Sequence, residues 1–391
     1  MARRRVGIVI TELGIPSEVW VLRQCLGFRG IEPVLISWKR AENGLALPPE
    51  LETRLFRTPF PPERSLPRRI AGRLGLPWAE SPNRAARADI RETLLGARLD
   101  GVLCHFAWTA IPVAAALEGA LPTVAHVHGR DVSALLRRQA YRRALAGALP
   151  RLAGLVAVGR FQIERLRPMG LPPRHEVIPC GAPVDLFARQ TLPERAEGEP
   201  MRFLSVSRLS PEKGVLETLE AFERVAARHP SAELAFGGDG PLAGALREAV
   251  ARSPAGDRVR LLGRLDQQAV AAEMARSHAF LLHSRSIGGW EEGAPVTLVE
   301  AGAAGLPRIA SRVGGSPELI EEGRDGFVIA PGDVAAQAEA MLALAEDEPR
   351  RRKIGRAARA SAAGFDSRLM TERLEALVLA ALDDAERARR D

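Results

Sequence analysis

The chain has 391 residues, of which 46% are hydrophobic and 26% are charged. Because one hydrophobic core usually stops growing at roughly 250 to 300 residues, this length predicts two domains, and the composition excludes a chain that is mostly disordered. No stretch has the roughly 20 apolar residues of a membrane-spanning helix, and the basic N-terminus lacks the features of a signal peptide. We therefore expect a cytoplasmic protein whose membrane contacts are peripheral.

Positive charge is concentrated in the N-terminal half. Residues 1–190 contain 28 Lys and Arg against 16 Asp and Glu, whereas the remainder contains 27 against 32. This excess favours an acidic partner, such as an anionic membrane surface or a phosphorylated acceptor, although an arginine-rich genome would explain it equally well. Nucleic acid is disfavoured, because a sequence with a single tyrosine does not interleave aromatic and basic side chains.

Short apolar runs alternate with longer amphipathic stretches, a pattern typical of βα units and a mostly parallel sheet. In the first half, strands are predicted at residues 6–10, 33–37, 101–104, 123–128, 154–158 and 176–178. In the second half, they are predicted at residues 202–206, 233–236, 259–262, 279–283, 308–311 and 327–329. Residues 189–200 are polar and contain two prolines, which predicts a linker. We therefore expect domains over residues 1–190 and 200–365, followed by a helix over residues 366–391.

Residues 58–83 are rich in proline and arginine and match neither a strand nor a long helix. We expect a surface segment that packs Leu74, Leu76 and Trp78 onto its own domain. The alternative is a short basic amphipathic helix over residues 68–78 that rests on anionic headgroups. The three cysteines, Cys25, Cys104 and Cys180, are not in metal-ligand spacing, so we expect them to be reduced and buried, with no metal site.

The first cluster with functional chemistry is SRLSPEKG at residues 207–214, which joins a predicted strand to a predicted helix. In open α/β sheets, ligands bind outside the carboxyl ends of strands, where helix N-termini favour anions. Arg208 provides a planar fork and Lys213 a compact charge, so together they suit a leaving diphosphate. Two solvated surface cations are the structural alternative.

The second cluster, EEGAPVTLVE at residues 291–300, leads into a helix that begins near Pro295. Glu292 lies in the loop and Glu300 lies in the early helix, so both can border one ligand at the helix N-terminus. Carboxylates accept hydrogen bonds from the vicinal hydroxyls of sugars and ribose. Acidic residues that merely complement the helix dipole are the alternative.

Three segments in order resemble the C-terminal domain of the retaining glycosyltransferases of family 4, also called glycosyl transferases group 1. They are SRLSPEKG at 207–214, EEGAPVTLVEAGAAGLP at 291–307 and ASRVGGSPELI at 310–320, and the likeness extends over residues 201–333. The resemblance implies the GT-B fold, an α/β fold in which two Rossmann-like doubly wound domains face each other across a cleft. It also implies that the final helix crosses back to the N-terminal domain.

The resemblance further implies a role for each matching residue. Arg208 and Lys213 would hold the donor diphosphate and Glu300 the ribose. Glu292 would contact the transferred sugar together with the backbone of Gly293, Ala294, Pro295 and Val296, and Leu265 would lie beside the base.

The N-terminal half resembles the family more loosely. Gly14 follows the first strand where the family often has two glycines, and it can bring backbone close to the diphosphate or simply form a turn. His128, at the end of a predicted strand, matches the family histidine beside the donor sugar, whereas His126 is expected to point into the core. Ser207, Cys180 and Arg308 depart from the family's glycine, asparagine and aliphatic residue, and we interpret Cys180 as a packing residue.

The sequence thus predicts a retaining glycosyltransferase that needs neither metal nor cofactor and uses a UDP- or GDP-linked sugar as co-substrate. Arg208, Lys213, Glu292 and His128 are its predicted catalytic residues. The acceptor would be a sugar or a lipid-linked sugar in exopolysaccharide, lipopolysaccharide or glycolipid biosynthesis. A sugar-nucleotide epimerase, a glycan phosphorylase and a non-catalytic nucleotide-sugar-binding subunit remain open alternatives.

Overall fold

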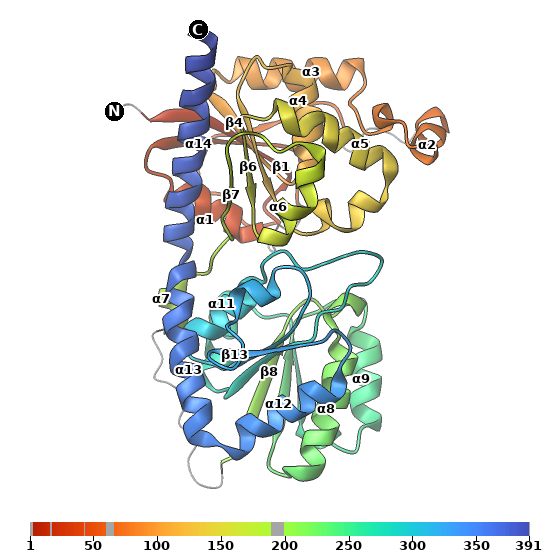
Figure 1. Ribbon diagram of the computed structural model, residues 1–391, viewed down its shortest axis with the longest axis vertical. Coiled ribbons are helices and arrows are strands. Elements are labelled where there is room, and N and C mark those ends of the chain that lie inside the picture. Colours follow the sequence, from red (N-terminus) through yellow and green to blue (C-terminus); the bar gives the residue numbers. More distant parts are fainter. Residues whose placement is uncertain (1–2, 16–17, 43, 60–65, 189–198, 391) are drawn as a thin grey trace. The chain divides into compact units, whose positions relative to one another are not determined.

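A computed structural model describes residues 3–15, 18–42, 44–59, 66–188 and 199–390 of the chain. The chain forms two compact units, of which the first comprises Met1–Cys180 with Arg368–Asp391 and the second comprises Gly181–Ser367 (Figure 1). Most of the predicted linker at residues 189–200 lies outside the described residues. Among the helices that the structure describes, none is long and apolar enough to cross a membrane.

The N-terminal unit is built on a parallel sheet of seven strands in the order β3-β2-β1-β4-β5-β6-β7. Its strands are β1 (Arg4–Leu13), β2 (Ile31–Arg40), β3 (Thr53–Leu55), β4 (Gly101–His105), β5 (Thr123–Val127), β6 (Gly154–Ala157) and β7 (His175–Val177). The chain reverses its direction of winding between β1 and β4, which is the topological switch point of the sheet. The predicted strands of this half are present, and β3 is an additional one. A strand of three residues at a sheet edge is too short to show an alternating pattern.

Helices connect these strands and cover both faces of the sheet. They are α1 (Val19–Gly27), α2 (Leu66–Arg73), α3 (Arg84–Gly96), α4 (Ala107–Leu117), α5 (Gln139–Ala148) and α6 (Arg160–Leu166), with short 3-10 turns η2 (Pro77–Ala79), η3 (Arg130–Val132) and η4 (Ala134–Arg137). Local sequence fixes the start of α3, where the Asn83 side chain accepts a hydrogen bond from the Ala86 amide.

The last helix, α14 (Ser367–Arg390), packs along the N-terminal unit beside α1 (Figure 1). Leu374, Val378 and Leu382 join the apolar core formed by β1 and α1. The Glu375 carboxylate accepts hydrogen bonds from three successive amides, those of residues 29–31, at 2.7–2.9 Å. Because these amides lead into β2, this carboxylate ties the end of the chain to the start of the sheet.

The C-terminal unit has a parallel sheet of six strands in the order β10-β9-β8-β11-β12-β13. Its strands are β8 (Arg202–Val206), β9 (Glu233–Gly237), β10 (Val259–Gly263), β11 (Ala279–Leu282), β12 (Arg308–Ser311) and β13 (Gly326–Ile329). Its helices are α7 (Val184–Ala188), α8 (Val215–Arg228), α9 (Ala243–Arg252), α10 (Gln267–Ala275), α11 (Val296–Ala303), α12 (Val334–Glu346) and α13 (Glu348–Ala362). The switch point lies between β8 and β11, so the prediction of two Rossmann-like α/β sheets is confirmed.

The proline- and arginine-rich segment at residues 58–83 does not pack as its sequence predicts. The expectation that Leu74, Leu76 and Trp78 pack onto their own domain is wrong, because these side chains are 64%, 38% and 47% exposed. The segment contains the short helix α2 followed by η2. Ile70 on α2 is also exposed, so this segment presents a group of large apolar side chains to solvent.

Arg308 lies on strand β12. The family that this sequence resembles usually has an aliphatic residue at this position. The Arg308 side chain is fully buried and forms an ion pair with Asp325 at 2.7 Å. The Ser361 hydroxyl accepts a further hydrogen bond from the guanidinium at 3.2 Å. Strand β12 thus stays buried because a partner carboxylate is buried with the arginine.

We predict that Asp325→Ala destabilises the C-terminal unit by about 3–5 kcal/mol, because it leaves the Arg308 charge buried without a partner. Denaturant unfolding followed by circular dichroism measures this effect. The double variant Arg308→Leu with Asp325→Ala should lose much less stability, since it buries no charge. A double variant that is less stable than Asp325→Ala would contradict this explanation.

Candidate functional site

The carboxyl edge of the C-terminal sheet brings together the loops that follow β8, β11 and β12. A Cβ atom added to Gly214, whose φ is +59°, would lie 1.9 Å from the carbonyl oxygen of His283 at the end of β11. A Cβ atom added to Gly314, whose φ is +55°, would lie 1.9 Å from the carbonyl oxygen of Glu292. Because only glycine permits both the conformation and the approach, these positions fix the three loops against one another.

Lys213 and Glu292 meet at this edge. The Lys213 ammonium forms an ion pair with the Glu292 carboxylate, and the Ser284 hydroxyl donates a hydrogen bond to the same carboxylate oxygen at 2.6 Å. The Lys213 nitrogen also lies 5.1 Å from the ring centroid of Trp290, within the range of a cation–π contact. An ammonium group has three donor hydrogens, so this ion pair orients Lys213 and leaves donors for an anionic ligand.

The other predicted donor-site residues lie in loops and helix starts that follow strands of the same sheet. Arg208 is exposed in the loop after β8, and its guanidinium has no side-chain partner among the residues that the structure describes. Helix α11 starts at Val296 after Pro295, so Gly293 and Ala294 directly precede its N-terminus. Buried Glu300 lies in α11 and accepts a hydrogen bond from Gln267 at 3.4 Å. Leu265, between β10 and α10, packs beside Gly237 at the end of β9.

The N-terminal unit places Gly14 at the end of β1. Gly14 has a φ of +81°, and its carbonyl accepts a hydrogen bond from the Leu45 amide at 2.7 Å. Nearby, Glu18 has one carboxylate oxygen that is buried without a partner in the described part of the chain. Burial, together with the charge of Glu12, raises the pKa of Glu18 to about 7. The loop therefore holds a carboxyl group that titrates near neutral pH, which the sequence did not indicate.

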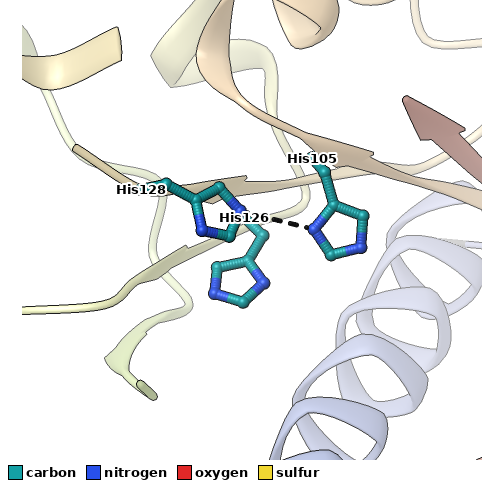
Figure 2. Close-up of side chains that lie close together, drawn as sticks. All are labelled: His105, His126 and His128. Carbon is teal, nitrogen blue, oxygen red and sulfur yellow. Dashed lines mark hydrogen bonds between the residues drawn. The ribbon is translucent and has the colours of Figure 1, made fainter. Parts of the chain in front are cut away.

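Three histidines lie together at the carboxyl ends of β4 and β5 (Figure 2). His105 and His126 are fully buried neighbours in the strand register, and His128 follows β5 and is the most accessible of the three. The His105 Nδ1 and His128 Nε2 atoms are 3.4 Å apart. The expected inward orientation of His126 is confirmed, and His128 is partly buried at the sheet edge.

Burial lowers the pKa of His105 and His128 well below the usual value and that of His126 to about 3, and neighbouring imidazoles lower the pKa of His105 and His128 further. The three rings are therefore neutral at physiological pH. Their ligand atoms all lie within 4.8 Å of one another, so they suit either a hydrogen-bonded chain or a shared divalent cation. In the part of the chain that the structure describes, no other group of histidine, cysteine or carboxylate side chains is arranged in this way.

Asp131 and Cys180 surround His128. The buried Asp131 carboxylate accepts hydrogen bonds from the backbone amides of His128, at 3.1 Å, and Ala107, at 2.9 Å. It therefore positions the segment that carries His128 against the start of α4. The Cys180 sulfur lies 3.7 Å from His128 Nδ1, and burial raises the pKa of the thiol to about 12. All three cysteines are free and buried, as expected, and a protonated Cys180 is suited to packing rather than to nucleophilic attack.

Sequence reasoning missed the aromatic residues at this edge. Trp20, on α1, lies with its ring centroid 4.5 Å from that of His128, and Phe106 lies 4.6 Å from it. Phe106 has a φ of +72°, a strained conformation for a bulky residue that is typical of functional sites. Phe106 lies two residues after the strand predicted at residues 101–104, and this place near a strand end is the signal that could have selected it. The backbone strain has no sequence signal.

Comparison with solved structures defines the class of protein. The crystal structure of Anabaena Alr3699/HepE in complex with UDP matches with a TM-score of 0.76 and 19% identity, covering 96% of this chain and 100% of that chain. At this level of identity the similarity shows the fold. The two Rossmann-like units therefore form a GT-B fold.

Two family models then identify the family. The model described as Glycosyl transferases group 1 matches residues 190–361, and the model described as Glycosyltransferase Family 4 matches residues 19–186. The chain belongs to the group 1 glycosyltransferase family of the GT-B fold.

Among curated proteins, the amylovoran biosynthesis glycosyltransferase AmsK of Erwinia amylovora is 33% identical over 198 residues, which are 48% of this chain and 49% of AmsK. A GDP-mannose-dependent monoacylated alpha-(1-6)-phosphatidylinositol monomannoside mannosyltransferase of Corynebacterium glutamicum is 29% identical over 66% of this chain and 69% of its own length. The chain thus matches about half the length of the first relative and about two thirds of the second.

We predict that Glu18 makes stability depend on pH. Because its pKa is raised to about 7 in the folded protein, the native state binds more protons than the unfolded chain between about pH 4.5 and 7, so stability falls as pH rises through this window. Glu18→Gln should therefore raise the free energy of unfolding by about 1–3 kcal/mol at pH 8 and have little effect at pH 4.5. Urea unfolding at both pH values measures this, with exposed Glu50→Gln as the control. An effect of Glu18→Gln that is the same at both pH values would contradict the prediction.

Proposed function

We propose that the protein is a retaining glycosyltransferase that transfers a sugar from a UDP- or GDP-linked donor to a hydroxyl group of an acceptor in polysaccharide or glycolipid biosynthesis. The observation that carries this proposal is the pairing of Lys213 with Glu292 at the switch point of the C-terminal sheet, where Arg208 lies in the same loop as Lys213. Cationic side chains at the carboxyl ends of the strands can bind a diphosphate, and acidic side chains can accept hydrogen bonds from sugar hydroxyls. The names of the relatives, which include an amylovoran biosynthesis enzyme and a GDP-mannose-dependent mannosyltransferase, support the same class of reaction.

The proposed reaction proceeds on one face of the donor sugar. The bond between the anomeric carbon and the diphosphate oxygen breaks, and the acceptor oxygen bonds to the anomeric carbon from the same face. The acceptor hydroxyl gives its proton to the departing diphosphate oxygen. Arg208 and Lys213 stabilise the negative charge that develops on the diphosphate, usually the largest electrostatic contribution to such a step. Glu292 orients Lys213 and contacts the sugar through its remaining oxygen.

We further propose separate roles for the other predicted residues. Glu300 binds the ribose hydroxyls, Leu265 lies beside the base, and residues 293–296 offer backbone groups to the sugar. In the N-terminal unit, the neutral His128 ring hydrogen-bonds the transferred sugar and Gly14 brings backbone to the diphosphate. The basic N-terminal half suggests an acceptor at an anionic membrane surface on the cytoplasmic side.

We predict that Arg208→Ala or Lys213→Ala lowers the turnover of sugar transfer by about a hundredfold or more, because each removes a charge-assisted contact that is strongest in the transition state. Turnover is measured with a panel of nucleotide sugars and acceptors, and circular dichroism verifies the fold. Arg252→Ala, on the exposed face of α9, is the matched control. Near-normal turnover in both variants would refute the assignment, and conversion of the donor sugar without an acceptor would favour an epimerase.

We also predict that EDTA leaves turnover essentially unchanged, because Arg208 and Lys213 supply the positive charge that a divalent cation would otherwise provide. Turnover is measured after dialysis against EDTA and again after zinc or magnesium is added back. Loss of activity that zinc restores would contradict metal independence, and it would indicate that His105, His126 and His128 bind a catalytic metal.

A further inference from the structure

The N-terminal unit contains a cavity of about 690 Å³ that the proposed mechanism does not use. Elements α2, η2, α4, η3, η4 and α5 contribute its lining. Six arginines line it, namely Arg68, Arg69, Arg73, Arg130, Arg137 and Arg138. The cavity therefore has a composition unlike that of an apolar gap between helices.

The charges of this cavity are largely uncompensated. Glu80 is the only carboxylate in its lining, and it forms an ion pair with Arg138. Among the residues that the structure describes, no carboxylate pairs with Arg69, Arg73, Arg130 or Arg137. These four arginines are exposed, so solvent screens their repulsion, and an anion in the cavity would be attracted by several guanidinium groups at once. Their planar forks match the oxygens of phosphate groups better than ammonium groups do.

The inner wall of the cavity is aromatic and leads toward His128. Trp108 lines the cavity, and its ring stacks on Phe106 with a centroid separation of 4.3 Å, while Phe106 in turn contacts His128. Tyr141 also lines the cavity, and its buried hydroxyl has no hydrogen-bond partner in the described part of the chain.

The segment that contributes Arg68, Arg69 and Arg73 to the cavity also carries exposed apolar residues. Ile70 lies on α2 between cavity-lining arginines, and Leu74, Leu76 and Trp78 follow in the same segment. Cationic and large apolar side chains on one short surface segment are the combination that binds at the interface of a lipid bilayer. A ligand held by the arginines would therefore have its lipid portion close to these side chains.

We propose that this cavity binds the phosphate or diphosphate group of a lipid-linked acceptor. The arginines hold the phosphate oxygens, and Ile70, Leu74, Leu76 and Trp78 insert among the lipid chains. The row formed by Trp108 and Phe106 leads from the phosphate toward His128, so the acceptor sugar lies at the edge of the sheet. This proposal rests on the proposed function, because it names the acceptor class of the same transferase.

The test uses the full chain and two double variants of equal net charge. Arg69→Gln with Arg137→Gln removes two unpaired cavity arginines, and Arg151→Gln with Arg167→Gln removes two exposed arginines of the same unit that lie outside the cavity. Flotation with neutral phosphatidylcholine vesicles that contain geranylgeranyl diphosphate measures binding. We expect the cavity variant to bind at least fivefold more weakly than the wild type and the control variant to bind normally. Equal binding by both double variants would overturn the proposal.

A second experiment separates the lipid from the phosphate. Calorimetric titration with inorganic diphosphate is performed in an Arg208→Ala, Lys213→Ala background, so that the donor site does not contribute. The protein could bind inorganic diphosphate through Arg69 and Arg137 and yet not bind vesicles that contain the lipid diphosphate. This result would overturn the proposal of a lipid-linked acceptor and indicate a soluble phosphorylated acceptor. In a further flotation, the vesicles contain anionic phosphatidylglycerol. If both double variants bind these vesicles equally more weakly than the wild type does, the attraction is general to the basic surface and the proposal is overturned.

Failure of the cavity and failure of the proposed function have different signatures. The cavity variants leave the C-terminal donor residues intact, so their binding of nucleoside diphosphates should equal that of the wild type. If the wild type binds no nucleoside diphosphate but binds the lipid diphosphate through Arg69 and Arg137, the transferase proposal fails and the cavity assignment stands. If it transfers sugar while the cavity variant retains full vesicle binding, only the cavity assignment fails.

Discussion

The candidate donor site depends on the close approach of backbone segments at the carboxyl edge of the C-terminal sheet. Gly214 lies against the His283 carbonyl, and Gly314 lies against the Glu292 carbonyl, at separations that exclude any side chain. These two contacts join the loops after β8, β11 and β12. As a consequence, Lys213 and Glu292, which are 79 positions apart in the sequence, form one ion pair. The charged side chains of the site are thus brought together by backbone contacts of two glycines, which carry no charge.

The carboxyl edges of the two sheets have different electrostatic environments. The C-terminal edge presents the cations Arg208 and Lys213 with buried carboxylates, an arrangement that suits a diphosphate and hydroxyl groups. The N-terminal edge presents imidazoles that burial keeps neutral, next to aromatic rings. Neutral donors and acceptors suit a sugar, because they bind hydroxyl groups without fixing a charge. Farther out, the N-terminal unit gathers arginines around a cavity.

The sequence predicted the fold class and most of the strands, because strongly apolar runs between glycine and proline signals determine where buried parallel strands occur. It also selected Arg208, Lys213 and Glu292, because these types follow strand ends where ligands bind in α/β sheets. Other features depend on tertiary contacts that a pattern does not contain. Burial raises the pKa of Glu18, Asp325 compensates buried Arg308, and Leu74, Leu76 and Trp78 remain exposed although their apolar character predicted packing. The strain at Phe106 likewise became visible only in the backbone.

We propose that the C-terminal edge binds the nucleoside diphosphate of a sugar donor and that Glu300 contacts the ribose. This binding is measured by calorimetric titration of UDP and GDP into the wild type and into Glu300→Gln. We expect one of the two nucleotides to bind the wild type and Glu300→Gln to weaken this binding by about 1–2 kcal/mol, the contribution of a hydrogen bond to a charged group. Binding of that nucleotide to Glu300→Gln as tightly as to the wild type, or binding of neither nucleotide to the wild type, would contradict this proposal.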